Sequence, residues 1–275
     1  MPELPEVESI ATRLRQGCSD HPPVPGLLIQ DAQVLWEGSI AAPQPQAFLE
    51  HIRDQRIEQI SRRGKYLILL LSQDALLIHL RMSGDIFILP KAEALPPHAR
   101  VTLTLSNGMV FVFNDPRKFG RIWLVSQAEE VLSGLGPEPF DDSLTPERFY
   151  QQLCQKKRLL KPLLLEQSFL AGLGNIYTDE ALYLARLHPL TKANLLTAED
   201  AKRLLESIRT VLTEGIQRNG ASIDWVYRGG DFQNYFRVYQ RAGEACPVCG
   251  TPIQRIVVGQ RGTHYCPNCQ RHPDG

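Results

Sequence analysis

The sequence has no hydrophobic run long enough to cross a membrane, and it lacks the basic and apolar start of a signal peptide. The longest apolar run, YLILLL, is strand-length, whereas a membrane-spanning helix needs about 20 residues. Internal repeats and low-complexity tracts are also missing. We therefore expect a cytoplasmic globular protein, and the content of 43% hydrophobic and 22% charged residues agrees with that class.

The chain also has no net charge, because 30 Lys and Arg residues balance 30 Asp and Glu residues. The charges are nevertheless unevenly distributed. Residues 1–150 carry 14 basic and 19 acidic side chains, a net −5, and residues 151–275 carry the remaining 16 and 11, a net +5. The two halves thus present surfaces of opposite sign to different partners. A basic stretch between Arg53 and Arg121 fits either a solvated surface or nucleic-acid contacts.

Cysteine is scarce, and four of the six lie close together near the C-terminus. Cys246, Cys249, Cys266 and Cys269 have the spacing C-x2-C-x16-C-x2-C, which is typical of a four-cysteine zinc site. Four thiolates leave no open coordination position, so we predict one structural Zn²⁺. Two redox dithiols are the alternative, but the tail has no thioredoxin-like pattern. The hairpin pattern IQRIVVGQRGTHY between the pairs presents Arg261 at its tip, for a phosphate or for solvent.

Turn residues and periodicity divide the chain into four regions. Residues 1–130 begin with a helix over 1–16 and continue with short apolar or alternating runs between turn signals. Residues 131–143 are rich in Gly, Pro and Asp and indicate a linker. Residues 144–240 have helical periodicity, and 241–275 are too short for a core without the metal. The expected fold class is α+β, with an N-terminal antiparallel β-sandwich, an N-terminal helix, a C-terminal helical domain and a zinc finger.

The expected strands lie in the runs LLIQDAQVLWEG, RIEQIS, KYLILLLS, ALLIHLRM, DIFILP, RVTLTLS and MVFVFND, with SNG as a hairpin turn between the last two. In the helical region we expect a first helix that breaks at Pro162 and a second that is capped by Asn175. A third opens with Thr197 and Asp200 as a capping box. Glycines before Asn175 leave its helix open to a polyanion, and Lys156 adds positive charge, although ordinary helix capping explains the same pattern.

The opening MPELPEVE fits a helix with Pro5 in its first turn. It also fits a catalytic terminus, because removal of Met1 would leave Pro2 with a free secondary amine. An α-amino group has a pKa of roughly 7.7–8.0, far below that of lysine. Such an amine is partly unprotonated near neutrality and can add to an electrophilic sugar carbon to give an iminium. Glu3, beside it, can move protons.

Eight ordered motifs resemble the bacterial formamidopyrimidine-DNA glycosylase family: MPELPEVE, RRGKYL, HLRMSG, NDPRKFG, LGPEP, GLGNIYTDEAL, HP and the tail CPVCGTPI…QRGTHYCPNCQR. The resemblance covers essentially the whole chain. It implies that the helical domain is a helix–two-turn–helix domain and that the partner is damaged double-stranded DNA, bound by a monomer. It also implies a bifunctional glycosylase and AP lyase that excises 8-oxoguanine and formamidopyrimidines in base excision repair.

The same resemblance implies catalytic roles for four residues. Pro2 matches the Schiff-base nucleophile, and Glu3 matches the proton donor in base excision. Lys65 in RRGKYL matches the lysine that assists β-elimination. Arg261 in QRGTHYC matches the arginine of δ-elimination.

Further matching residues are expected to contact DNA, in two groups. Those that grip the backbone are His98, Arg117, Lys156 and Asn175. Those that fill the gap left by an everted base are Met82, Arg117 and Phe119. Apolar side chains replace lost stacking, and an arginine can hydrogen-bond the orphaned base.

The chain departs from the family pattern in places that bear on the preferred lesion. Arg81 stands where glycine is common, and Arg100 where a second histidine is frequent. The segment with Trp225 and Tyr227 is short where relatives have a glycine-rich loop over the extruded base. Oxidised pyrimidines, as in endonuclease VIII-type relatives, are therefore the alternative substrates. A zinc-finger protein that binds damaged DNA without chemistry is the alternative from another class.

Overall fold

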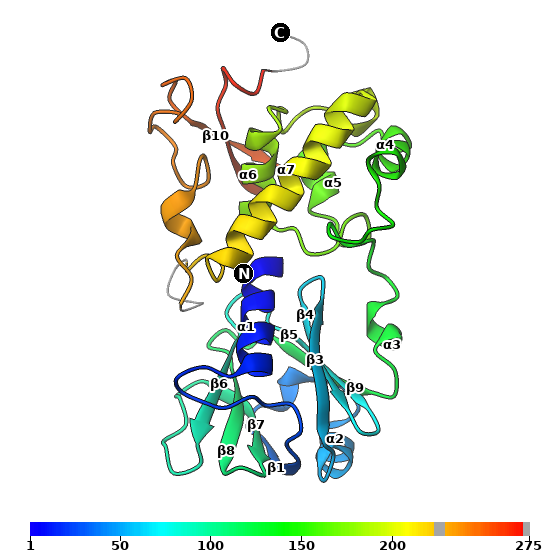
Figure 1. Ribbon diagram of the computed structural model, residues 1–275, viewed down its shortest axis with the longest axis vertical. Helices are drawn as coiled ribbons and strands as arrows, with labels where there is room; N and C mark the ends of the chain where they lie inside the picture. The colour runs from blue at the N-terminus through cyan, green and yellow to red at the C-terminus, as the bar shows by residue number, and fades with distance from the viewer. Residues whose placement is uncertain (223–228, 272–275) are drawn as a thin grey trace. The chain divides into compact units, whose positions relative to one another are not determined.

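The computed structural model describes residues 1–222 and 229–271 (Figure 1). The chain forms two compact units. Unit 1 combines Met1–Ser133 with Asn219–Gly230, and unit 2 consists of the remaining residues. Unit 1 is therefore assembled from two stretches that are far apart in the sequence.

Unit 1 opens with α1 (Leu4–Gln16). Glu3 is its N-cap and forms a reciprocal capping box with Glu6, whose side chain accepts the Glu3 backbone N–H at 2.7 Å. Pro5 lies in the first turn, where its missing N–H costs no helical hydrogen bond. The apolar face of α1 joins the core of the sandwich, and the helix runs along β3 (Ile57–Arg63) and β4 (Tyr66–Leu71).

Two sheets form the sandwich of unit 1. A four-stranded sheet has the order β1-β7-β8-β6, and a five-stranded sheet has the order β2-β9-β5-β4-β3. All pairs are antiparallel except the edge pair of β2 and β9. One core cluster takes residues from both sheets and from α1. The strands are β1 (Ile29–Val34), β2 (Ile40–Ala42), β3 (Ile57–Arg63), β4 (Tyr66–Leu71), β5 (Ala75–His79), β6 (Asp85–Pro90), β7 (Ala99–Leu105), β8 (Met109–Asn114) and β9 (Arg121–Val125).

The seven runs expected as strands all contain strands of the sandwich, and the SNG turn joins β7 to β8. Five short elements were not expected: β2, β9, η1 (Glu37–Ser39), α2 (Pro45–Ile52) and α3 (Glu129–Leu132). β2 has only three residues, which is too few for alternation to be recognised. α2 buries only Phe48 and Ile52, so its apolar face is short.

Unit 2 is helical apart from the zinc-finger hairpin. Its long helix α7 begins with the expected capping box, because Thr197 and Asp200 accept each other's backbone N–H groups. The elements are α4 (Pro146–Cys154), α5 (Leu160–Leu164), α6 (Asn175–Leu184), η2 (Ala193–Leu195), α7 (Ala198–Gln217), η3 (Phe232–Tyr235), β10 (Gln254–Val258) and β11 (Arg261–Tyr265). The two strands form the hairpin expected between the cysteine pairs.

Two boundaries in unit 2 differ from the sequence expectation. The break in the first helical segment lies between α4 and α5, and Pro162 is inside α5. Proline fits there because the N–H groups of a helix's first turn have no acceptor within the helix. The N-cap of α6 is Gly174, so Asn175 is the first helical residue and not the cap.

Within the described residues, every helix is too short or too polar to span a membrane. The segment with Trp225 and Tyr227, expected as a short loop, lies outside the described residues.

Candidate active site and nucleic-acid interface

Pro2, Glu3 and Lys65 are all buried in unit 1. Pro2 and Glu3 directly precede α1, and only 2% of Glu3 is exposed. Lys65 occupies the two-residue turn between β3 and β4, where Gly64 has φ +57°. Only 4% of Lys65 is exposed. Charged side chains are rarely buried without a partner or a task.

Contacts between α1 and β3 show that the chain start and this turn lie at the same end of unit 1. Arg15, near the end of α1, donates to the backbone oxygen of Ile60 at 3.4 Å. Glu8, two turns earlier, accepts from Nε of Arg62 at 2.9 Å. The start of α1 therefore lies at the same end of unit 1 as the β3–β4 turn, because earlier residues of α1 pair with later residues of β3. Burial alone would raise the pKa of Glu8, but hydrogen bonds from Arg15 and Arg62 outweigh it and lower the pKa.

The second stretch of unit 1 closes the same end. Glu6 is buried, and its Oε1 accepts the backbone N–H of Ala221 at 2.8 Å. Gly220 has φ +80°, and a Cβ there would lie 2.6 Å from Oε1 of Glu6. Only glycine therefore allows the backbone to approach the carboxylate this closely.

His79, at the end of β5, lies beside the cationic part of this site. Burial, followed by the positive charges of Arg81 and Lys65, lowers its pKa to about 3. Its Nδ1 accepts the backbone N–H of Arg81 at 3.0 Å, so the neutral ring carries its proton on Nε2. The ring meets that of Tyr66 edge-on at 4.7 Å between centroids. Arg81 has φ +55°, the left-handed region that favours glycine, which explains why glycine suits this position.

A buried carboxylate, that of Asp115, connects the two segments that carry the expected wedge residues. Its Oδ1 accepts from the hydroxyl of Ser83 and from the backbone N–H of Arg117, the latter at 3.2 Å. Its Oδ2 accepts the backbone N–H of Gly120 at 2.7 Å. Asp115 thus closes the loop 115–120 and fixes it to the turn after β5.

Through this connection Ser83, the residue after Met82, is bonded to the loop that carries Arg117 and Phe119. Met82 is half-buried next to Ser83, and Phe119 is 50% exposed. The guanidinium carbon of Arg117 lies 5.1 Å from the centroid of the Phe119 ring, within cation–π range. An exposed phenyl ring on a braced loop is suited to contact an unstacked base.

His98 and Arg100 support the root of the same loop. The backbone oxygen of His98 accepts the N–H of Asp115 at 2.9 Å, and the side chain of His98 is exposed. Nε of Arg100 donates to the backbone oxygen of Asp115 at 2.8 Å. Sequence reasoning missed the bracing role of Asp115 and Ser83, although the Asp-Pro turn in NDPRKFG was a signal for the first of them.

In unit 2 the structure brings Asn175 and the finger hairpin together. Gly259 and Gln260 have φ +55° and +62°, as in a tight two-residue hairpin turn, and Arg261 follows it as an exposed residue. Asn175 donates from Nδ2 to the backbone oxygen of Gly262 at 3.1 Å. Its Oδ1 is buried and has no hydrogen-bond partner among the residues that the structure describes. Lys156 is exposed on the loop after α4.

The four cysteines of the finger have the geometry of a zinc site. Their sulfur atoms all lie within 4.8 Å of one another, and the close pairs are 3.5–3.9 Å apart. A tetrahedron with Zn–S bonds of about 2.3 Å has sulfur–sulfur edges of about 3.8 Å, so the cluster fits one Zn²⁺. Hydrogen bonds from Thr251 and Asn268 lower the pKa of Cys249 to about 5, whereas burial raises the pKa values of Cys266 and Cys269. The sulfur geometry therefore carries the zinc assignment.

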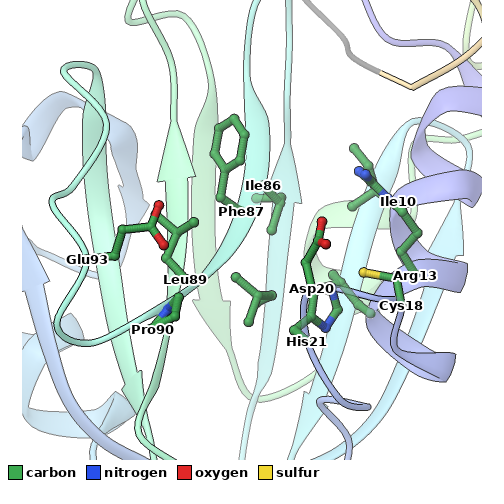
Figure 2. A pocket seen from close by; sticks show the side chains of 12 residues that line it. Ile10, Arg13, Cys18, Asp20, His21, Ile86, Phe87, Leu89, Pro90 and Glu93 are labelled. Atoms are coloured by element: carbon green, nitrogen blue, oxygen red, sulfur yellow. The ribbon is translucent and has the colours of Figure 1, made fainter.

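A hollow of about 350 Å³ lies between α1 and β6, and Figure 2 shows the side chains that line it. Its lining includes the apolar residues Ile86 and Leu89 and the charged residues Arg13, Asp20 and Glu93. Among the described residues that line it, there is no residue expected for catalysis or DNA contact. The candidate site is therefore at the start of α1 and not in this hollow.

The sandwich, the helical unit and the four-cysteine finger each match a domain known from DNA glycosylases. Family models match along the chain. The formamidopyrimidine-DNA glycosylase N-terminal domain matches residues 1–122, and the H2TH domain of the same enzymes matches residues 135–226. The zinc finger found in FPG and IleRS matches residues 243–271.

Full-length relatives agree with the domain matches. The chain is 41% identical to a formamidopyrimidine-DNA glycosylase of Protochlamydia amoebophila and 42% identical to that of Herpetosiphon aurantiacus, over 98% of this chain and 100% of each relative. Two solved structures are similar over 98% of this chain and 100% of theirs. One is the Lactococcus lactis enzyme bound to DNA with an AP site, with 34% sequence identity and a TM-score of 0.89. The other is MutM bound to DNA with carbocyclic 8-oxo-G, with 35% sequence identity and a TM-score of 0.89.

The chain belongs to the formamidopyrimidine-DNA glycosylase family. This membership confirms the expected family, the α+β fold class and the enzyme class. The finger match and the clustered cysteines confirm the expected structural zinc site.

Proposed function

We propose that this protein is a bifunctional DNA glycosylase and AP lyase that excises oxidised purines from damaged double-stranded DNA in base excision repair. Pro2, freed by removal of Met1, is the nucleophile. The observation that carries the proposal is the burial of Pro2 and Glu3 at the end of unit 1 where Lys65 is also buried. We further propose that the enzyme acts as a monomer on chromosomal DNA in the bacterial nucleoid.

The chemistry begins when the lone pair of the Pro2 nitrogen attacks C1′ of the damaged nucleotide and the bond from C1′ to the base breaks. The base leaves with a proton, and the Pro2 nitrogen loses its own. Opening of the sugar ring, with a proton from Glu3 to O4′, converts the adduct into an iminium. The iminium acidifies the C2′ protons. Their removal, assisted by Lys65, expels the 3′ phosphate, and Arg261 assists the later loss of the 5′ phosphate.

The remaining residues hold the substrate in a form that permits attack. His98, Arg117, Lys156 and Asn175 contact the backbone, where the positive charge of Arg117 and Lys156, the ring N–H of His98 and the amide of Asn175 suit phosphate. Met82 and Phe119 enter the stack beside Arg117 and occupy the space of the extruded base. Extrusion costs a few kcal/mol, least for a damaged base, and this wedge offsets part of that cost.

Borohydride trapping tests the proposal. With duplex that contains 8-oxoguanine, the unmodified protein should form a covalent adduct and cleave the strand. Pro2→Gly, and protein in which Met1 is retained, should form neither. Pro5→Ala is the matched control, because Pro5 lies in the first turn of α1 and has an inert amide nitrogen. Tight binding without an adduct or cleavage would favour the non-catalytic DNA-binding protein. Preferred trapping on thymine glycol would favour the oxidised-pyrimidine specificity.

A further inference from the structure

Two side chains of α6 hold two residues of β11 in register. Asn175 donates to the backbone oxygen of Gly262, and Asp179 accepts the backbone N–H of His264 at Oδ2, at 2.9 Å. Asn175 and Asp179 are four residues apart on a helix, a rise of about 6.0 Å. Gly262 and His264 are two residues apart on a strand, a rise of about 6.6 Å. The two spacings match, so the pair of hydrogen bonds forms only in one register.

Asp179 is held in turn by Lys161 of α5. Nζ of Lys161 contacts Oδ1 of Asp179, and both side chains have no solvent exposure. The ring Nδ1 of His264 lies 3.4 Å from Oδ2. A buried ion pair seldom adds net stability, because removing both charges from water costs about as much as their attraction returns. The ion pair instead fixes the carboxylate of Asp179, whose other oxygen, Oδ2, faces the hairpin.

The tip of the hairpin has a third contact. A Cβ on Gly259 would lie 3.0 Å from Cγ of Pro162, the residue after Lys161, so the turn packs directly on α5. Arg261 is therefore flanked on one side by a turn seated on Pro162 and on the other by Gly262, which Asn175 holds. Arg261 itself is exposed. Its backbone is fixed while its guanidinium is open to a ligand.

We propose that Asp179, supported by Lys161, is a positioning residue that sets the register of the finger hairpin on α6 and so places Arg261 beside Asn175. The inference rests on the proposed function, in which Arg261 assists the loss of the 5′ phosphate. Without the acceptor at Asp179, the hairpin keeps its zinc and its strand pairing but shifts along α6. Displacement of a catalytic group by about 1 Å can reduce a rate by about 100-fold.

The expected signature is a change in products, because only the second elimination uses Arg261. The double variant Lys161→Met/Asp179→Leu removes the acceptor and both buried charges together. We expect its δ- to β-elimination product ratio on duplex with an abasic site to fall about 10- to 100-fold, close to the ratio of Arg261→Ala. Borohydride trapping through Pro2 and the zinc content should stay at the level of the unmodified protein.

The matched control is Lys161→Met/Asp179→Asn. It removes the same two charges, but the asparagine oxygen can still accept the N–H of His264, so its δ to β ratio should stay near that of the unmodified protein. An unchanged ratio in the leucine variant, or an equal loss in both variants, would overturn the proposal. Failure of the proposed function looks different, because the unmodified protein itself would then give no adduct and no elimination products.

Hydrogen exchange gives a second measurement if the leucine variant does not fold. In the unmodified protein the backbone N–H of His264 should exchange as slowly as the paired amides of β10 and β11, because Asp179 accepts it in a buried site. Exchange as fast as at the Gly259–Gln260 turn would show that this hydrogen bond does not hold the hairpin and would overturn the inference.

Discussion

Replacement of His79 by asparagine should make unit 1 less sensitive to mild acid. His79 is buried, and burial together with the charges of Arg81 and Lys65 lowers its pKa to about 3, against 6.5 for an ordinary histidine. In asparagine the side-chain oxygen occupies nearly the place of Nδ1. It can therefore still accept the backbone N–H of Arg81, but it does not titrate.

The direction and size of the effect follow from the two pKa values. Between pH 6.5 and pH 3 the unfolded chain binds a proton at His79 and the folded chain does not, so the free energy of unfolding falls as the pH falls. Each pH unit is worth about 1.4 kcal/mol. At pH 5, one and a half units below the unfolded pKa, the loss from His79 is about 2 kcal/mol. It approaches about 5 kcal/mol only near pH 3.

Urea unfolding at pH 7.5 and pH 5.0 measures this loss. Trp123, whose ring lies 5.7 Å from that of Tyr66, reports on unit 1 by fluorescence. The unmodified protein should lose about 2 kcal/mol more than His79→Asn between the two pH values, since all other titrating groups are common to both. His51→Asn, on the surface of the same unit, is the control and should behave like the unmodified protein.

Equal losses in the unmodified protein and in His79→Asn would refute the reasoning. That result would mean that the folded protein accepts a proton on His79 at pH 5, so the ring would be neither desolvated nor held neutral by the neighbouring cations. A larger loss in the asparagine variant would have the same consequence.

Three further changes have defined outcomes. Asp115→Ala removes the acceptor of the Ser83 hydroxyl and of the Gly120 N–H, and one of two acceptors of the Arg117 N–H, so we expect a loss of about 2–4 kcal/mol in thermal unfolding. A loss below about 0.5 kcal/mol would show that the loop 115–120 does not depend on Asp115. Gly220→Ala should destabilise unit 1 by at least 1 kcal/mol more than Gly108→Ala, because only the Cβ at position 220 would meet Glu6. Gly108 is the control, since it has nearly the same φ with open space around it. Equal effects would exclude the close approach of Gly220 to Glu6. Removal of zinc by a chelator should abolish duplex binding and leave the unfolding transition of unit 1 in place, and binding that survives proven zinc loss would contradict the role of the finger.

Local patterns were enough to predict most of the sandwich and the finger. Runs such as RVTLTLS and MVFVFND alternate or stay apolar over strand length, and the SNG turn between them fixes their pairing. The cysteine spacing alone predicted the zinc cluster. The prediction missed β2 because three residues are too few to show a strand period. It placed the helix break at Pro162 because, in the sequence, proline in a first helical turn cannot be told from proline in a helix interior.

Long-range contacts were beyond the sequence. Ser83 and Asp115 are 32 residues apart, and Asp179 and His264 are 85 apart. No periodicity relates such positions, because sheet order and helix packing decide which polar groups meet. His79 shows the same limit. In the run ALLIHLRM, His79 looks like any other strand residue. Its lowered pKa follows only from its burial and its cationic neighbours in the fold.

The return of residues 219–222 to unit 1 constrains how this protein can be made. On the ribosome, the first 133 residues emerge long before Ala221, so the carboxylate of Glu6 lacks its amide partner until most of the polypeptide has been translated. The end of unit 1 that carries Pro2 and Glu3 therefore stays incomplete in the nascent chain. A gene fragment that stops at the first boundary would encode α1 and the strands of the sandwich, but not the backbone N–H of Ala221 that the Glu6 carboxylate accepts.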